Sequence, residues 1–240
     1  MEILLRGAVQ LGLDLSKKQV ERFELFQTEL LDWNKNLNLT SLKTSHLIQS
    51  KHFLESISSY KLIKNSYPNR LSLLDLGSGA GFPGIPLRIM DDNIDLCLVE
   101  SINKKTLFLH HISRKLALQN VNIVSERAEI IAKQATYRES FDVVISRAVA
   151  RLDTLLELAL PLVKVGGLFI AHKSMNVQSE IHNADAASTL LGGEISSVQE
   201  ISIKDILYPS TLVLYKKVKK SPQIYPRKPG VPKKNPINYS

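Results

Sequence analysis

Cysteine is almost absent from this chain of 240 residues, which contains only Cys97. A single thiol excludes an intramolecular disulfide framework and a structural zinc site built from several cysteines. Cys97 lies in the apolar run IDLCLVE, where we expect a buried strand residue. The six histidines show no metal-ligand spacing, so we expect no bound metal.

Long apolar runs are also missing. The best candidate, residues 152–171, is interrupted by Asp153, Glu157 and Lys164, so no segment has the roughly 18 consecutive apolar residues of a membrane span. The opening MEILLRGAVQLGL carries two charges in its apolar stretch and has no small-residue cleavage site. We therefore expect a cytoplasmic protein that does not associate with membranes.

Acidic residues are missing from the C-terminal segment. Residues 216–240 contain eight lysines and arginines and no Asp or Glu, which leaves 23 cations against 23 anions upstream. The segment therefore carries the whole net charge of +8. Its charge and its many prolines favour an extended arm that lies along a polyanion, and a disordered solubilising tail is the alternative.

The rest of the chain divides into a helical part and a strand-rich part. Segments 3–11, 19–31 and 46–62 have roughly helical apolar spacing, with Ser16 as a candidate N-cap, and predict an N-terminal appendage over residues 1–70. From 71 to 215, continuous apolar runs alternate with helical stretches, as in a doubly wound, mainly parallel α/β sheet. The runs 192–203 and 210–217 have no helix between them and predict an antiparallel pair at one edge.

The stretch LLDLGSGAGFPGIPLRI, residues 73–89, holds four glycines directly after the first predicted strand. Glycines at such a turn let a ligand approach the backbone closely. The dinucleotide pattern G-x-G-x-x-G/A fits Gly77 and Gly79 but finds Phe82 at its third position, and no P-loop string is present. A nicotinamide-dependent oxidoreductase is therefore the weaker alternative.

The string DLGSGAG, with Asp75 before Gly77, resembles the first motif of class I S-adenosylmethionine-dependent methyltransferases. In that family the acid near the turn lies close to the amino acid part of the cofactor. A second acid, Glu100, ends the next predicted strand, where its oxygens can accept both ribose hydroxyls. Glu100 supports a nucleoside ligand without choosing between the methyltransferase and the oxidoreductase.

The acceptor is constrained by missing motifs. After the fourth predicted strand the chain reads FDVVISRAVA, without the N/D-P-P-Y/F string of methyltransferases that modify exocyclic amines, and Cys97 is misplaced for a cysteine nucleophile. An acceptor that needs no proton removed, such as guanine N7, fits the absence of an evident base. The sequence therefore designates no catalytic acid or base.

Six strings together resemble the glucose-inhibited division protein B family, the bacterial-type 16S ribosomal RNA guanine-N7 methyltransferases. They are WNKNLNLTS (33–41), DLGSGAGFPGIPL (75–87), SINKKTLFL (101–109), RAE (127–129), SRAVA (146–150) and YPRKPGVPKKNPI (225–237). The resemblance implies S-adenosylmethionine as cofactor and 16S ribosomal RNA, in a small ribosomal subunit or its precursor, as partner. A non-catalytic RNA-binding module would explain the basic tail but leave the glycine turn without a role.

The resemblance also implies the site residues. Cofactor-binding residues would be Asp75, Gly77, Gly79, Phe82, Glu100, Ala128, Glu129 and Arg147, with Ala128 and Glu129 at the adenine and Arg147 beside the methyl donor. Lys173 would contact RNA, although Ser174 stands where the family usually has glycine. Asn38 and His52 are further candidates for ribosomal RNA contact, and packing or solvent exposure is the alternative role for His52.

Overall fold

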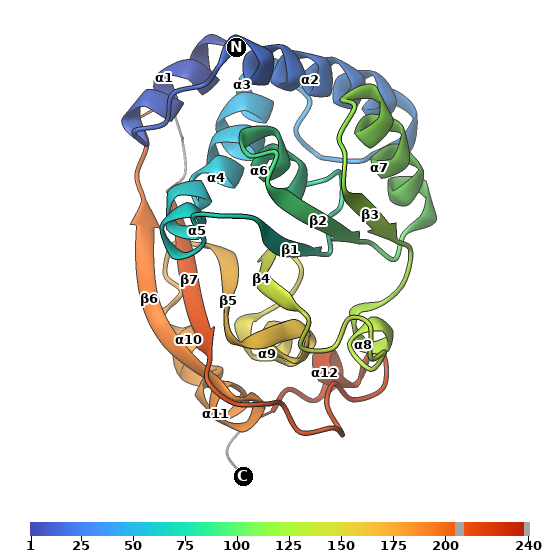
Figure 1. The fold of residues 1–240 in the computed structure, drawn as a ribbon, viewed down its shortest axis with the longest axis vertical. Helices are drawn as coiled ribbons and strands as arrows, with labels where there is room; N and C mark the ends of the chain where they lie inside the picture. The colour runs from blue at the N-terminus through green and yellow to red at the C-terminus, as the bar shows by residue number, and fades with distance from the viewer. Residues whose placement is uncertain (205–208, 238–240) are drawn as a thin grey trace.

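The computed structural model, which describes residues 1–204 and 209–237, is built on a seven-stranded sheet in the order β3-β2-β1-β4-β5-β7-β6 (Figure 1). The first five strands run parallel, β7 is antiparallel to β5, and β6 pairs antiparallel with β7. The expected fold class, including the antiparallel edge, is confirmed. The strands are β1 (Leu71–Leu76), β2 (Ile94–Val99), β3 (Val121–Val124), β4 (Phe141–Arg147), β5 (Val163–Ser174), β6 (Gly193–Ile201) and β7 (Ser210–Lys217).

Helices cover both faces of the sheet, and each face has its own core. Successive strand side chains point to opposite faces, so Leu73 belongs to the cluster under α6 and α7 whereas Leu74 belongs to the cluster under α9. This is why the central strands are continuously apolar. The helices after β1 are α6 (Gly84–Met90), α7 (Asn103–Lys115), α8 (Ala128–Ile131), α9 (Leu152–Ala159), α10 (Gln178–Asn183), α11 (Asp185–Leu191) and α12 (Val231–Lys234).

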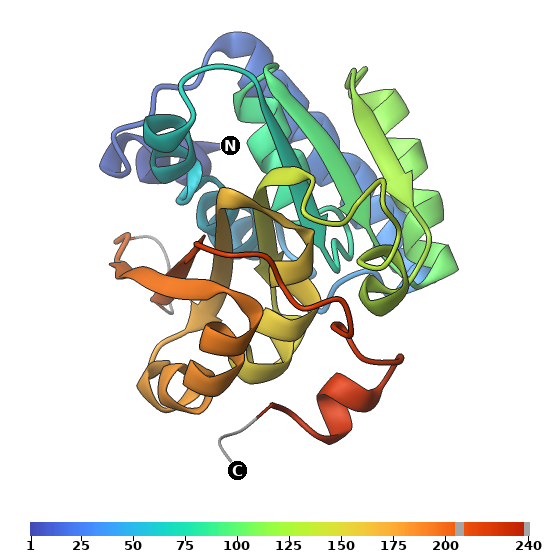
Figure 2. The ribbon, with the colours of Figure 1, turned by 60° about the horizontal axis from the view of Figure 1, so that its bottom comes forward.

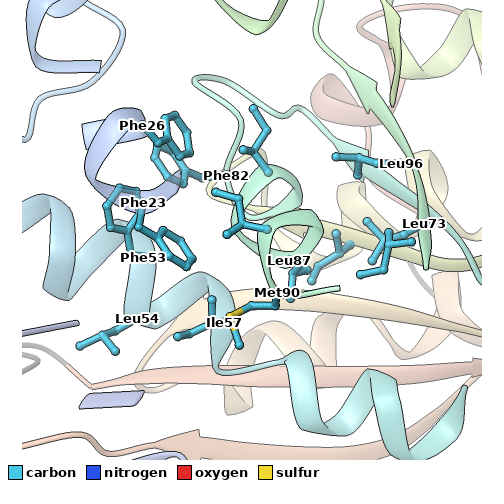
Figure 3. Packing of buried hydrophobic residues seen from close by; sticks show 14 of the residues in the cluster. Phe23, Phe26, Phe53, Leu54, Ile57, Leu73, Phe82, Leu87, Met90 and Leu96 are labelled. Carbon is cyan, nitrogen blue, oxygen red and sulfur yellow. The ribbon is translucent and has the colours of Figure 1, made fainter. Parts of the chain in front are cut away.

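The expected N-terminal helices are present, and among them α2 packs against α6 and α7 and α4 packs against α6 (Figure 1). A capping box begins α2, because the Ser16 hydroxyl accepts from Gln19 N–H and the Gln19 side chain accepts from Ser16 N–H. Phe26 and Phe53 meet Phe82 of the glycine turn, with ring centroids 5.1 and 6.1 Å apart (Figure 3). These helices are α1 (Glu2–Gln10), α2 (Lys17–Leu37), α3 (Ser45–Leu47), the π-helical stretch Ile48–Leu54, α4 (Glu55–Ile57) and α5 (Tyr60–Ser66).

The C-terminal segment folds back onto the domain (Figure 2). Strand β7 continues to Lys217, whose ammonium is buried and donates to Leu160 O, Leu191 O and Ser221 Oγ. The alternative of a disordered tail is therefore wrong for residues 216–237, whereas contact of this basic segment with a polyanion stays a prediction. Residues 238–240 lie outside the described part. Charge and proline content could not reveal the carbonyl and carboxylate groups that bind Lys217 and Arg227.

Candidate active site

The turn after β1 has the backbone that its glycines predict. Gly77, Gly79 and Gly81 have φ of 74°, 58° and 94°, a region that side chains with a Cβ rarely adopt. The N–H groups of Gly77 and Ser78 both donate to Val99 O, at 2.9 and 3.0 Å. The turn is therefore fixed to the end of β2.

Glu100 follows β2 and ties its carboxylate to the same turn. Its Oε2 accepts from Gly79 N–H at 2.9 Å, and its Oε1 accepts from Ile102 N–H at 2.8 Å. Each carboxylate oxygen keeps a further lone pair for a ligand. Glu100 thus stands as a fixed acceptor at the edge where the parallel strands end.

Asp75 lies beneath the turn instead of on its open side. The residue is fully buried, and its Oδ2 accepts from Gly84 N–H at the start of α6, at 2.8 Å. Burial raises the pKa of the Asp75 carboxyl to about 7. Its Oδ1 has no hydrogen-bond partner among the described residues, which leaves one buried acceptor next to the turn.

A cavity of about 210 Å³ opens beside Gly77, between the carboxyl ends of β1 and β4. The strand order reverses at this point, which is where open α/β sheets bind their ligands. Four of the predicted residues meet here: Gly77, Glu100, Ala128 and Glu129. The other lining residues are Leu76, Val99, Ser101, Glu126, Arg127, Val149, Ala150, Thr154, Leu158, Gly230, Pro232 and Lys233.

Three lining residues come from the C-terminal segment and were not predicted as site residues. Gly230 N–H donates to Glu129 Oε1 at 3.0 Å, and Pro232 and Lys233 of α12 lie at the cavity wall. In the sequence, RKPG belongs to one of the strings that carry the family resemblance, but no site role was predicted for it. Its approach to Glu129, 101 positions upstream of Gly230, is encoded by no local pattern.

A wider cavity of about 520 Å³ lies at the opposite edge, near the amino ends of β1 to β4. Cys97 lines it, is buried, and burial raises the pKa of its thiol to about 12. The predicted role of Cys97 as a buried strand residue is confirmed. None of the predicted cofactor or RNA residues lines this cavity.

Phe82, Arg147 and His52 form a second cluster, behind the turn. The His52 ring stacks on Phe82 with centroids 4.2 Å apart, and the Arg147 guanidinium carbon lies 5.2 Å from the Phe82 centroid. Arg147 Nη2 donates to His52 Nδ1 at 2.8 Å. Since a guanidinium only donates, His52 carries its proton on Nε2, which donates to Thr40 Oγ1 at 2.8 Å.

Arg147 therefore joins the end of β4 to the N-terminal helices. It also donates to Lys51 O at 2.9 Å and lies 3.5 Å from Glu55 Oε2. Burial, and secondarily the Arg147 charge, hold the pKa of His52 well below its usual value. The cluster gives Arg147 the partners that a largely buried cation requires.

The remaining predicted residues, Lys173 and Asn38, lie apart from the cavity lining. The Lys173 ammonium is 2.6 Å from Glu180 Oε2 and donates to Ala150 O at 3.0 Å, so it sits directly behind a lining residue. Asn38 is exposed and ends α2 with φ of 48°. The structure thus divides the predicted residues into a cavity group, a cluster behind it and an exposed helix end.

Among the described residues, no group of three or more His, Cys, Asp and Glu side chains can hold a metal ion. None of their helices is long and apolar enough to cross a membrane. The site combines a glycine turn and a fixed carboxylate with an Asp75 oxygen that is buried beneath the turn and has no hydrogen-bond partner among the described residues. These features suit a nucleoside with a charged amino acid group, and the sheet order with its antiparallel edge defines a class I methyltransferase fold.

The chain belongs to the family described as GidB, rRNA small subunit methyltransferase G, whose model matches residues 19–207. It is 42% identical over 236 residues to "Ribosomal RNA small subunit methyltransferase G" of Clostridium botulinum, covering 98% of each chain. A putative O-methyltransferase from Klebsiella pneumoniae has the same fold, with a TM-score of 0.57 at 14% identity over 81% of this chain and 90% of that one. The TYW2 protein of M. jannaschii, solved with AdoMet, has a TM-score of 0.50 at 13% identity over 68% and 77%.

Proposed function

We propose that this protein transfers a methyl group from S-adenosylmethionine to N7 of a guanine in 16S ribosomal RNA. The family match over residues 19–207 carries the proposal, and the cavity beside Gly77 and Glu100 supports it. A ribosomal RNA substrate, in a small subunit or its precursor, implies a cytoplasmic site of action.

Different cavity residues would contact different parts of the cofactor. Glu100 is positioned to accept the ribose hydroxyls, since both its oxygens are already oriented by Gly79 and Ile102 N–H groups. Ala128 and Glu129, at the start of α8, would border the adenine. Bound at the turn, the sulfonium supplies an electrophilic methyl group.

Asp75, Phe82 and Arg147 support the turn from behind. The Asp75 carboxylate fixes the start of α6, and its free Oδ1 faces no partner among the described residues. A cationic amino acid group nearby would lower the pKa of Asp75 from its raised value, because an opposite charge favours the carboxylate. Phe82 packs between the N-terminal helices and the turn, with Arg147 over its ring.

The acceptor chemistry suits guanine N7. Its lone pair is free at neutral pH, so catalysis rests on aligning the acceptor with the methyl group. His52 uses both ring nitrogens within the protein, towards Arg147 and Thr40, and offers no free base. We infer that His52 positions Arg147 and Phe82, whereas Asn38 and Lys173 contact RNA.

A methylation assay tests this function. Purified protein is incubated with labelled S-adenosylmethionine and small subunits from cells that lack the corresponding gene, and the RNA is digested to nucleosides. We expect label in 7-methylguanosine, and Glu100→Ala should abolish it whereas Glu194→Ala, on the exposed edge strand β6, should not. Label in another nucleoside, or no transfer by the wild type, would contradict the proposal.

A further inference from the structure

The C-terminal segment lies across the outside of the cofactor cavity, where Gly230, Pro232 and Lys233 face Glu100 and Glu129. Figure 2 shows this segment running past α8 and α9. Its string PRKPGVPKK, residues 226–234, is part of the segment expected to lie along a polyanion. Its position at the cavity indicates a further role.

Arg227 holds the segment in place. Its Nη2 lies 2.6 Å from Glu157 Oε2, its Nε donates to Glu157 Oε1 at 2.9 Å, and its backbone N–H donates to the same oxygen at 2.8 Å. The Glu157 side chain, on α9, is only 1% exposed. A buried carboxylate with two-point contact to a guanidinium is a strong and directional anchor.

Three further hydrogen bonds set the segment against the cavity. Gly230 N–H donates to Glu129 Oε1 at 3.0 Å, Thr154 Oγ1 donates to Pro232 O at 3.3 Å, and Arg227 Nη2 donates to Asn235 O at 2.7 Å. Thr154 is three residues before Glu157, so both lie on one face of α9. The elements that line the cavity are therefore also those that hold the segment.

Gly230 makes the sharp approach possible. Its φ is 82°, and a Cβ built there meets nothing within 4 Å. Glycine is thus required by the backbone conformation and not by a lack of space. The turn places Pro232 and Lys233 at the cavity while Lys228 and Lys234 remain exposed.

We propose that residues 227–234 form the outer wall of the cofactor pocket at its adenosine end, with Arg227 as the positioning residue that holds the wall closed. The proposal rests on the proposed function, because it needs an adenosine-containing ligand in the cavity. The adenosine end is assigned because the wall contacts Glu129, at the start of α8. The wall should slow the loss of bound cofactor.

Calorimetry with S-adenosylmethionine and S-adenosylhomocysteine tests the wall. Arg227→Met should weaken the binding of both ligands at least tenfold, whereas Lys228→Met, its exposed neighbour, should stay within twofold of the wild type. Circular dichroism and thermal unfolding without ligand check that each variant is folded.

A second pair of variants leaves the Arg227–Glu157 anchor intact. Lys233 and Lys234 are adjacent and exposed, but only Lys233 lines the cavity. Lys233→Ala should weaken S-adenosylhomocysteine binding at least threefold and Lys234→Ala should not. S-adenosylhomocysteine lacks the sulfonium charge. Its affinity therefore measures the contribution of the wall without repulsion between the Lys233 ammonium and a sulfonium.

Hydrogen exchange provides a readout independent of activity. Either ligand should slow amide exchange in residues 227–234 of the wild type, and less so in Arg227→Met. A wild type that binds the ligands, with Arg227→Met and Lys233→Ala binding equally well and no added protection of the segment, would overturn the wall. A wild type that binds neither ligand would instead overturn the proposed function.

Discussion

Replacing His172 with leucine should stabilise the protein, and more so as the pH falls. His172 lies on β5 beside Arg147 of β4 and is 2% exposed. Neither of its ring nitrogens has a hydrogen-bond partner among the described residues. Burial, and secondarily the Arg147 charge, lower the pKa of His172 from 6.5 to about 3.

The size of the effect follows from two contributions. Burial of an unsatisfied polar group costs about 1 to 3 kcal/mol at any pH, and leucine of similar volume avoids that cost. The second contribution depends on pH, because the unfolded state binds a proton below pH 6.5 that the folded state refuses until about pH 3. At pH 5 this proton lowers the free energy of unfolding by about 2 kcal/mol, and at pH 8 by almost nothing.

Urea unfolding of the wild type and His172→Leu at pH 8 and pH 5 measures both contributions. The gain from leucine should be larger at pH 5 by about 2 kcal/mol. His110→Gln, at an exposed position on α7, serves as the control and should shift stability little at either pH. A stability difference that does not change with pH, or a less stable leucine variant, would show that the buried imidazole does not destabilise the folded protein as argued.

Three further predictions concern other parts of the molecule. Gly77→Ala should weaken S-adenosylmethionine binding and cost about 1 kcal/mol of stability, because φ is 74° and the added Cβ would clash with Val149 Cγ2. Adding Val149→Ala should relieve the clash but not the backbone strain. Calorimetry showing wild-type affinity for Gly77→Ala would count against the turn as cofactor site. Ser16→Ala should lower the free energy of unfolding by about 1 kcal/mol because the α2 cap is removed, and an unchanged urea midpoint would refute that. Replacing both Lys228 and Lys234 by methionine should reduce the slope of log affinity for ribosomal RNA against log salt concentration. The reduction should be about 0.7 to 0.9 for each phosphate that the two lysines neutralise. An unchanged slope would show that these exposed cations contact no phosphate.

Local patterns predicted the sheet, its antiparallel edge and the turn, because strand periodicity and glycine conformations are encoded within short windows. Glu100 was found for the same reason, since it directly ends a predicted strand. The pairing of Arg147 with His52 joins residues 95 positions apart. Motifs pointed to both residues, but only the fold shows that they hydrogen-bond to each other.

The C-terminal wall could not be predicted from the sequence, for a different reason. A stretch of lysine and proline has the composition of a solvated tail, and composition does not record that Glu157 is buried on α9 opposite Arg227. Two other buried groups, Lys217 and His172, depend likewise on what surrounds them. Sequence patterns describe an element's own tendencies, whereas burial of a charge is decided by distant partners.

A crystal structure with bound S-adenosylmethionine is the decisive measurement for the cofactor site. We expect adenosine in the cavity of Gly77, Glu100 and Glu129, with the Glu100 carboxylate at the ribose and the C-terminal wall over the adenine. Cofactor bound elsewhere, for example in the cavity beside Cys97, with Gly77 and Glu100 left untouched, would show that the glycine turn has another purpose.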